Sequence, residues 1–123
     1  MKKLTLKQQA KLRKRLIKKL DSTCSLKVRE RDKFCRKCRK APASQAAHIF
    51  SRSNMATRWD LRNLLGMCFY CHLYWGHREP VEFTLWVKKE LGEELFRELE
   101  LLARSVKQWS INELEELLTH EKE

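Results

Sequence analysis

Two Cys-x-x-Cys pairs, Cys35 with Cys38 and Cys68 with Cys71, constrain the fold of this chain more than any other feature of its sequence. Each pair can place two thiolates on one metal ion from a tight turn, and four thiolates complete the closed tetrahedral site of a structural zinc ion. The 29 residues between the pairs must then fold as an excursion from two anchored ends. A redox role for the pairs is the competing interpretation, and the fifth cysteine, Cys24, is expected to be a plain thiol.

Positive charge is concentrated at the front of the chain. Lysine and arginine number 27 against 16 acidic residues, a net charge of +11, and the first 40 residues hold 17 basic residues against three acidic ones. Leucines at roughly helical spacing predict one amphipathic basic helix over residues 5–20. Such a helix is typical of a surface that binds a polyanion such as nucleic acid. A solvated surface helix packed by its leucines is the alternative.

The acidic last third of the chain is predicted to be helical. Pro80 fits the first position of a helix, Gly92 is a natural joint, and Ser110 with Glu113 forms a capping box that opens a last short helix. No run approaches the ~20 apolar residues of a membrane span, and no apolar run follows the first four residues. A soluble, cytoplasmic protein is therefore expected.

Three polar, ligand-capable side chains occur in order around the excursion. His48 lies in an apolar segment over residues 45–50 that is short enough for a β-strand. Asn63 follows fifteen residues later, and His72 nine residues after that, directly behind the second cysteine pair. A lone histidine is most often a satisfied core residue, but three such residues framed by four cysteines form a more specific pattern.

This pattern resembles the HNH nucleases, whose fold is a ββα-metal finger. The stretch from His48 to Asn63, HIFSRSNMATRWDLRN, is similar to the phage NinG (Rap) recombination proteins, and the resemblance covers about residues 30–115. It implies metal-dependent cleavage of DNA in phage recombination, at branched or junction structures, in the host cell cytoplasm. The fold class expected is α+β with three parts: a basic N-terminal helix or arm over residues 1–28, a zinc-stabilised ββα-metal core over 29–79, and a C-terminal helical segment over 80–123 packed on that core.

The resemblance assigns a role to each of the three polar residues. His48 matches the general base that deprotonates the attacking water, and an imidazole with a pKa near ~6.5 suits this task at neutral pH. Asn63 matches the asparagine that orients this base or braces its loop. His72 matches the histidine that binds one hard divalent cation, Mg²⁺ or Mn²⁺, which stabilises the leaving oxygen.

One position departs from the family pattern. Many HNH nucleases carry Asp or His immediately before the base as a second metal ligand, and here that position is Ala47. His77, Asp60, Gln45, or water and phosphate oxygens can supply the missing ligand. His77 is the first of these candidates, although five residues after His72 it shares an α-helical face poorly unless the helix ends nearby. A non-catalytic, zinc-containing DNA-binding recombination accessory protein is the alternative function.

Basic side chains are expected to hold DNA through its phosphates without reading bases, so that affinity falls steeply with salt. Arginine gives bidentate phosphate contacts, and plain solvent exposure is the alternative for those near the loop. The leucine-rich segment 93–118 is a candidate homodimer interface. The candidate DNA contacts are Arg52, Arg58 and Arg62 beside the histidine loop, and Lys11, Arg13, Lys14, Arg15, Lys18, Lys37 and Arg39 in the basic front.

Overall fold

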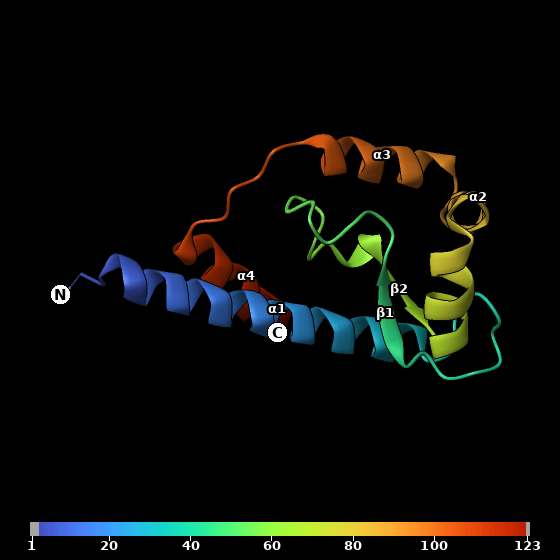
Figure 1. Ribbon diagram of the computed structural model, residues 1–123, viewed down its shortest axis with the longest axis horizontal. Coiled ribbons are helices and arrows are strands. Elements are labelled where there is room, and N and C mark those ends of the chain that lie inside the picture. Colours follow the sequence, from blue (N-terminus) through green and yellow to red (C-terminus); the bar gives the residue numbers. More distant parts are fainter. Residues whose placement is uncertain (1–2, 123) are drawn as a thin grey trace.

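One long helix, α1, runs along one side of the molecule, and the two strands and the last helix pack against it (Figure 1). A computed structural model describes residues 3–122. The fold is α+β and mostly helical, with one two-stranded sheet among the described residues. In chain order the elements are α1 (Leu6–Asp32), β1 (Gln45–His48), the 3-10 turn η1 (Leu61–Asn63), β2 (Leu64–Met67), the short π-helix η2 (Tyr70–Gly76), α2 (Pro80–Leu91), α3 (Glu93–Arg104) and α4 (Ile111–Lys122).

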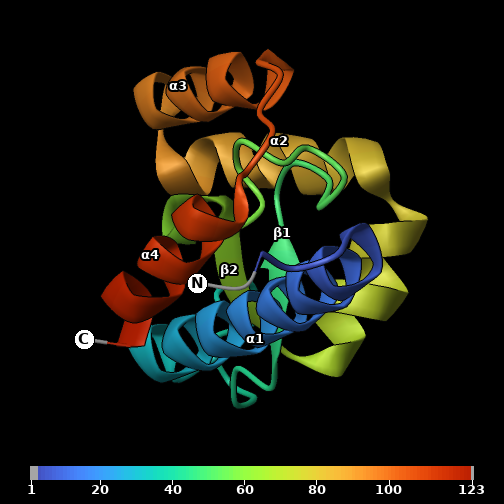
Figure 2. The same ribbon diagram turned by 90° about the vertical axis from the view of Figure 1, so that its left-hand side faces the viewer.

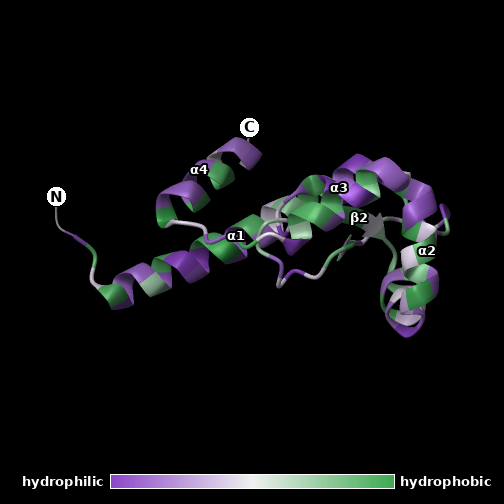
Figure 3. Ribbon diagram, turned by 90° about the horizontal axis from the view of Figure 1, so that it is seen from above, coloured by the Kyte–Doolittle hydropathy of each residue, from purple (hydrophilic) through white to green (hydrophobic). Residues whose placement is uncertain are grey.

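Helix α1 begins at a capping box and is much longer than the helix predicted over residues 5–20. The Thr5 hydroxyl accepts a hydrogen bond from the Gln8 backbone N–H (3.1 Å), and the Gln8 side chain accepts one from the Thr5 backbone N–H (2.9 Å). Along the helix, hydrophilic residues alternate with hydrophobic ones (Figure 3). The helix continues to Asp32 because one side chain per turn stays buried: Leu16, Leu20, Cys24 and Val28.

The sheet divides the interior into two hydrophobic clusters. Strand β1 lies antiparallel to β2, with Ala47 opposite Leu65 and His48 opposite Leu64. Because successive side chains of a strand point to opposite faces, Leu64 packs with the apolar stripe of α1, whereas Leu65 packs with Ala47 and the cysteines. The predicted strand within residues 45–50 is therefore confirmed, and it separates the α1 cluster from the cysteine cluster.

The C-terminal helices form where their capping residues predicted them. Gly92, with φ of 90°, separates α2 from α3. At the start of α4, the Ser110 backbone N–H donates to the Glu113 carboxylate (2.9 Å) and the Glu113 N–H donates to the Ser110 hydroxyl (3.1 Å), which completes the capping box. Helices α2 and α3 supply Val87 and Phe96 to the cysteine cluster.

Helix α4 lies beside α1 and runs in the same direction (Figure 2). Near its start the Arg13 guanidinium donates to the Trp109 carbonyl, and near its end Lys27 pairs with Glu121 at 3.4 Å. The expected boundary at residue 28 therefore falls inside a continuous helix whose two halves both pack on later parts of the chain. None of the helices in residues 3–122 is both long and apolar enough to cross a membrane.

Candidate functional site

The two cysteine pairs meet at the end of the sheet. The four sulfur atoms lie within 4.8 Å of one another, and within residues 3–122 they form the only group of three or more His, Cys, Asp or Glu residues close enough to share an ion. Three of these cysteines are buried, and Cys24 lies apart from them in the α1 cluster. Four thiols at this spacing could bind a metal and are compatible with a structural zinc site. The cluster consists of Cys35, Cys38, Cys68 and Cys71.

Tight turns bring the thiols of each pair to the same side. In the first turn the Cys35 N–H donates to the Ala41 carbonyl (2.8 Å), and Arg39 takes the left-handed conformation with φ of 59°. Backbone N–H groups of Ala41 and Lys40 lower the pKa of Cys38 to about 6, so this thiol is largely ionised at neutral pH. Burial raises the pKa of Cys71, and a bound cation would reverse that by favouring the thiolate.

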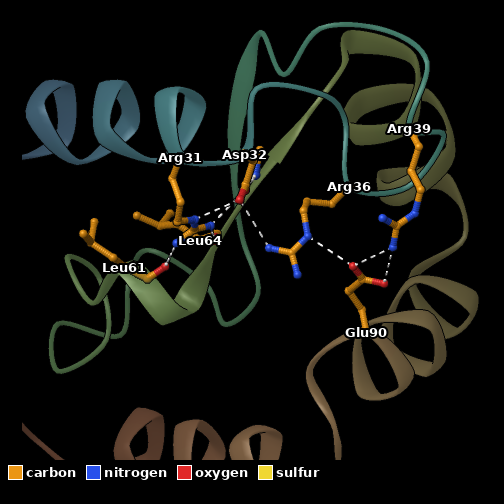
Figure 4. Close-up of polar contacts among 8 residues, drawn as sticks. Arg31, Asp32, Arg36, Arg39, Leu61, Leu64 and Glu90 are labelled. Carbon is orange, nitrogen blue, oxygen red and sulfur yellow. Dashed lines mark hydrogen bonds and ion pairs between the residues drawn. The ribbon is translucent and has the colours of Figure 1, made fainter.

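An ion-pair network fixes the first cysteine turn against the end of α1, β2 and α2 (Figure 4). The Asp32 carboxylate accepts hydrogen bonds from the Gly66 backbone N–H (2.7 Å) and from the Arg31 guanidinium (2.8 Å). Arg36 lies 3.4 Å from Asp32 and 3.1 Å from Glu90, which also pairs with Arg39 at 3.2 Å. Arg39, a predicted DNA contact, thus shares Glu90 with Arg36, although most of the Arg39 side chain is exposed.

A cavity of about 560 Å³ opens between α1, β1 and η2. Three of the four histidines of the chain, His48, His72 and His77, line it. Arg52 and Arg58 from the loop after β1 line it as well. The structure therefore brings both predicted catalytic histidines, the candidate second ligand and two predicted phosphate-binding arginines to one hollow.

His48 is held at the end of β1 in a defined orientation. Its Nε2 donates a hydrogen bond to the Arg58 carbonyl (3.0 Å), so Nδ1 carries the lone pair in the neutral ring. Burial lowers the pKa of His48 below its ordinary value of 6.5, and the nearby Arg52 adds to this shift, although the Arg58 carbonyl opposes it. The imidazole is therefore neutral at pH 7 and able to accept a proton.

Asn63 is fully buried and braces the loop that follows β1. Its Oδ1 accepts from the Phe50 N–H (2.9 Å), and its Nδ2 donates to the carbonyls of Phe50 (3.1 Å) and Thr57 (3.2 Å). These bonds use both ends of the amide and none of them goes to His48. Of its two predicted roles, Asn63 performs the bracing one in this structure.

The π-helix η2 explains how His72 and His77 come together. An α-helix would separate residues five apart, whereas the i→i+5 bonding of a π-helix places them on one side. Their ring centroids lie 4.9 Å apart, and η2 ends at Gly76. His72 Nδ1 donates to the Gln45 side-chain oxygen (2.7 Å), which leaves its Nε2 unprotonated in the neutral ring. Burial, reinforced by His77 and His48, lowers the pKa of His72.

The other candidates for the missing metal ligand lie elsewhere. Ala47 points into the cysteine cluster, where it is 1% exposed, and does not line the cavity. Asp60 caps η1 and accepts hydrogen bonds from Arg62, whose guanidinium also approaches Glu98. Gln45 is occupied by His72. Among the sequence candidates that the cavity brings beside His72, only His77 remains.

Sequence reasoning missed Asp21, which α1 contributes to the cavity wall. Its carboxylate accepts from the Arg58 guanidinium (2.7 and 3.0 Å), from the Trp59 indole N–H (2.8 Å) and from Arg52 (3.3 Å). The sequence could have indicated this residue, since Asp21 is the only acidic residue among the first 29 residues. Asp21 holds the two arginines whose predicted partner was a phosphate.

The basic residues of the front are distributed over different faces. Lys11, Lys14 and Lys18 are exposed on the side of α1 opposite its buried stripe. Arg15 is also exposed, whereas Arg13 donates to Trp109 on the α4 side. The Lys37 ammonium lies 4.8 Å from the ring centroid of a tryptophan, Trp75.

No family model matches this chain, and comparison with curated proteins and with solved structures found no match either.

Proposed function

We propose that this protein is an HNH-type endonuclease that cleaves DNA with the help of a divalent metal ion. The observation that carries the proposal is the meeting of His48, His72 and His77 in one cavity whose wall also holds Arg52 and Arg58. Two antiparallel strands followed by a short helix bring them together, which is the element order of a ββα-metal core. Action on branched DNA in phage recombination rests on the resemblance of the stretch from His48 to Asn63 to NinG proteins.

In the proposed reaction His48 is the general base. Its Nδ1 takes a proton from the water that attacks the phosphorus, while its Nε2 keeps the hydrogen bond to the Arg58 carbonyl. Positive charge that develops on the ring is stabilised by this carbonyl. Arg52, whose side chain is largely exposed, binds phosphate oxygens and orients the scissile bond, and Arg58, held by Asp21, adds its positive charge to the cavity wall.

His72 and His77 would hold the divalent ion, because both line the cavity and the Nδ1 hydrogen bond to Gln45 directs the Nε2 lone pair of His72 toward a metal. Bound there, the ion supplies Lewis-acid stabilisation of the leaving oxygen. Two imidazole donors suit a first-row transition metal better than Mg²⁺. Mn²⁺ is therefore expected to support more activity than Mg²⁺, with water and phosphate oxygens as the remaining ligands.

Structural Zn²⁺ is the metal proposed for the four-cysteine cluster. Four sulfur donors in closed tetrahedral geometry favour Zn²⁺ over Mg²⁺ or Mn²⁺. The cysteines themselves make up much of the hydrophobic cluster that supports β1 and η2. Zinc would thus stabilise the elements that carry His48 and His72.

A DNA-binding protein without nuclease activity is the second candidate. The observation in its favour is the donor set: Asp21 is the only carboxylate among the described residues that line the cavity, and the arginines hold it.

A homodimer through segment 93–118 also stays a proposal. Within one chain Leu99 and Leu114 are buried, whereas Leu101 and Val106 remain exposed.

Nicking of supercoiled plasmid and cleavage of a four-way junction separate the two candidates. Purified protein is incubated with Mn²⁺ or Mg²⁺, with EDTA as control, beside a matched preparation of His48→Ala. A general base contributes typically ~10²–10⁴-fold to the rate, so the variant should lose at least that much cleavage and keep its DNA affinity and zinc content. Equal cutting by both preparations would refute the assigned base. If the wild-type protein cuts no duplex, junction or flap substrate, the second candidate, a DNA-binding protein without nuclease activity, is supported.

A further inference from the structure

A column of aromatic rings stands on the outside of η2. The rings of Tyr70 and Tyr74 are stacked, with centroids 5.0 Å apart and planes inclined by 20°. The guanidinium of Arg78 lies 4.6 Å from the centroid of Tyr74. One helical turn separates each member of this column from the next, so Tyr74 lies between Tyr70 and Arg78.

The column does not belong to either hydrophobic cluster. Tyr70 is 61% exposed and Tyr74 is 50% exposed, and Phe69 beside them is 63% exposed. Among the described residues no carboxylate forms an ion pair with Arg78. Within the column Tyr74 is covered by Tyr70 and by Arg78, so the face that remains open to a ligand is the outer face of the Tyr70 ring.

The same short helix presents two different faces. Residues four to five apart share a side of η2, which groups Tyr70 with Tyr74 on one face and His72 with His77 on another. A ligand bound to the tyrosine face would therefore lie one helix diameter from the histidine cavity.

We infer that Tyr70, Tyr74 and Arg78 form a stacking platform for the unpaired bases of a DNA single strand. Any base can stack on a phenol ring, because every base has a flat π-face. The Arg78 guanidinium continues the stack and carries a positive charge for the neighbouring phosphate. A base pair inside an intact duplex cannot offer its face in this way, so the platform selects DNA with an unpaired segment.

Charge complementarity favours nucleic acid over an aromatic surface of another protein. The column itself carries the positive charge of Arg78, which lies over Tyr74, and the chain as a whole has a net charge of +11. The inference rests on the proposed function for the presence of DNA, and it adds the class of substrate. Its test needs neither cleavage nor a catalytic metal.

The test is a titration of full-length protein with a fluorescent 15-nucleotide single strand and with the duplex of the same sequence, in EDTA-free buffer without Mg²⁺ or Mn²⁺. Tyr70→Ala and Tyr74→Ala should each lower single-strand affinity about 5- to 150-fold and change duplex affinity less than about two-fold. Tyr70→Phe should retain wild-type affinity, because the phenyl ring keeps the stacking face.

Val81→Ala and Leu85→Ala are the matched controls, since both side chains are exposed on the neighbouring helix and lie outside the column. Zinc content and circular dichroism establish that each variant is folded. Unchanged single-strand affinity of both tyrosine variants overturns the inference, even where duplex binding and cleavage persist. A change in sedimentation coefficient instead of DNA affinity also overturns it and assigns the face to self-association. Loss of single-strand affinity without any cleavage by wild type supports the platform and removes the nuclease.

Discussion

A single buried amide, Asn63, supports the histidine cavity, although its hydrogen bonds go to backbone groups and not to a histidine side chain. Its three hydrogen bonds close the loop between β1 and β2, and the backbone of that loop supplies the Arg58 carbonyl that orients His48. Replacement of a buried amide that satisfies three backbone groups leaves those groups without partners. Asn63 is therefore expected to affect the orientation of His48 through the loop.

The protonation of His48 predicts how activity depends on pH. The pKa of His48 lies below 6.5, so raising the pH through this region converts the ring to the neutral base. At saturating Mn²⁺ the cleavage rate should rise with pH along a limb whose midpoint lies below 6.5, and it should level off by pH 7. A pH–rate profile of plasmid nicking measures this. A midpoint above pH 7 would contradict the assignment.

Asp21 is expected to contribute to stability through the loop arginines. Burial raises the pKa of Asp21, but hydrogen bonds from Arg58 and Trp59 outweigh it and hold the pKa below 3.8. Asp21→Asn should lower the free energy of unfolding by about 1–3 kcal/mol at pH 7. The difference from wild type should shrink as the pH falls below 3.8, because the wild-type carboxylate then becomes protonated.

Urea unfolding at pH 7 and at pH 3 measures this contribution. Glu30→Gln is the matched control, since Glu30 lies exposed on the same helix. An equal loss of stability in the two variants would show that Asp21 acts only through the charge of the helix.

At the scale of elements, the sequence correctly predicted those features that depend on residues close to one another in the chain. The capping box at Ser110, the joint at Gly92 and the strand around His48 all appear, because each depends on neighbours in sequence. The full length of α1 was missed, since serine and threonine around Cys24 hide an apolar stripe that later elements bury. The π-helix was missed as well, so the sequence named His77 as the first candidate beside His72 without revealing the helix geometry that brings the two rings together.

The proposed role of α1 in DNA binding can be tested without removing the helix. Its buried leucines belong to the core, so deletion of residues 1–20 would disturb the fold as well as the charge. Lys11, Lys14 and Lys18 lie on the outer face and can be changed to Gln together. If all three contact duplex phosphates, the slope of log affinity against log salt should flatten by about 2.7, at about 0.9 per contact.

Lys89→Gln, Arg97→Gln and Arg104→Gln combined in one variant form the control, because three exposed charges are removed from the acidic end of the chain. Binding titrations across a range of salt concentrations compare the two variants. Equal slopes in both would show that the outer face of α1 does not lie on DNA.

At the scale of the whole molecule, the two hydrophobic clusters depend on different forces. The α1 cluster is made of aliphatic and tryptophan side chains with the single cysteine Cys24, whereas the second cluster includes three buried cysteines that a metal would hold together. Sequence spacing predicted the cysteine cluster because four thiols have few other uses in such a pattern. The sequence did not reveal the ion pairs of Arg52 and Arg58 with Asp21 or that of Arg62 with Glu98. Folding brings these acidic partners close from distant positions in the sequence.

One zinc ion per chain is expected in the reduced, folded protein. Cys38→Ser should abolish zinc binding and unfold the part of the chain around β1 and η2, because metal binding contributes about 10–16 kcal/mol of apparent folding energy in small zinc domains. Elemental analysis and thermal melting measure both effects. Cys24→Ala is the control and should keep one zinc ion per chain, since Cys24 lies outside the cluster. Folded, reduced wild-type protein that contains no zinc would refute the site.

The continuity of α1 sets a length scale for any duplex that would bind along it. Its 27 residues extend for about 40 Å at 1.5 Å per residue, and one turn of B-DNA extends for about 34–36 Å. A duplex that lies along the outer face of α1 is thus covered over little more than one turn. If DNA binds in this way, the length of a single helix sets the footprint of one chain, and because α1 also carries Asp21 the histidine cavity lies at a fixed position along that footprint.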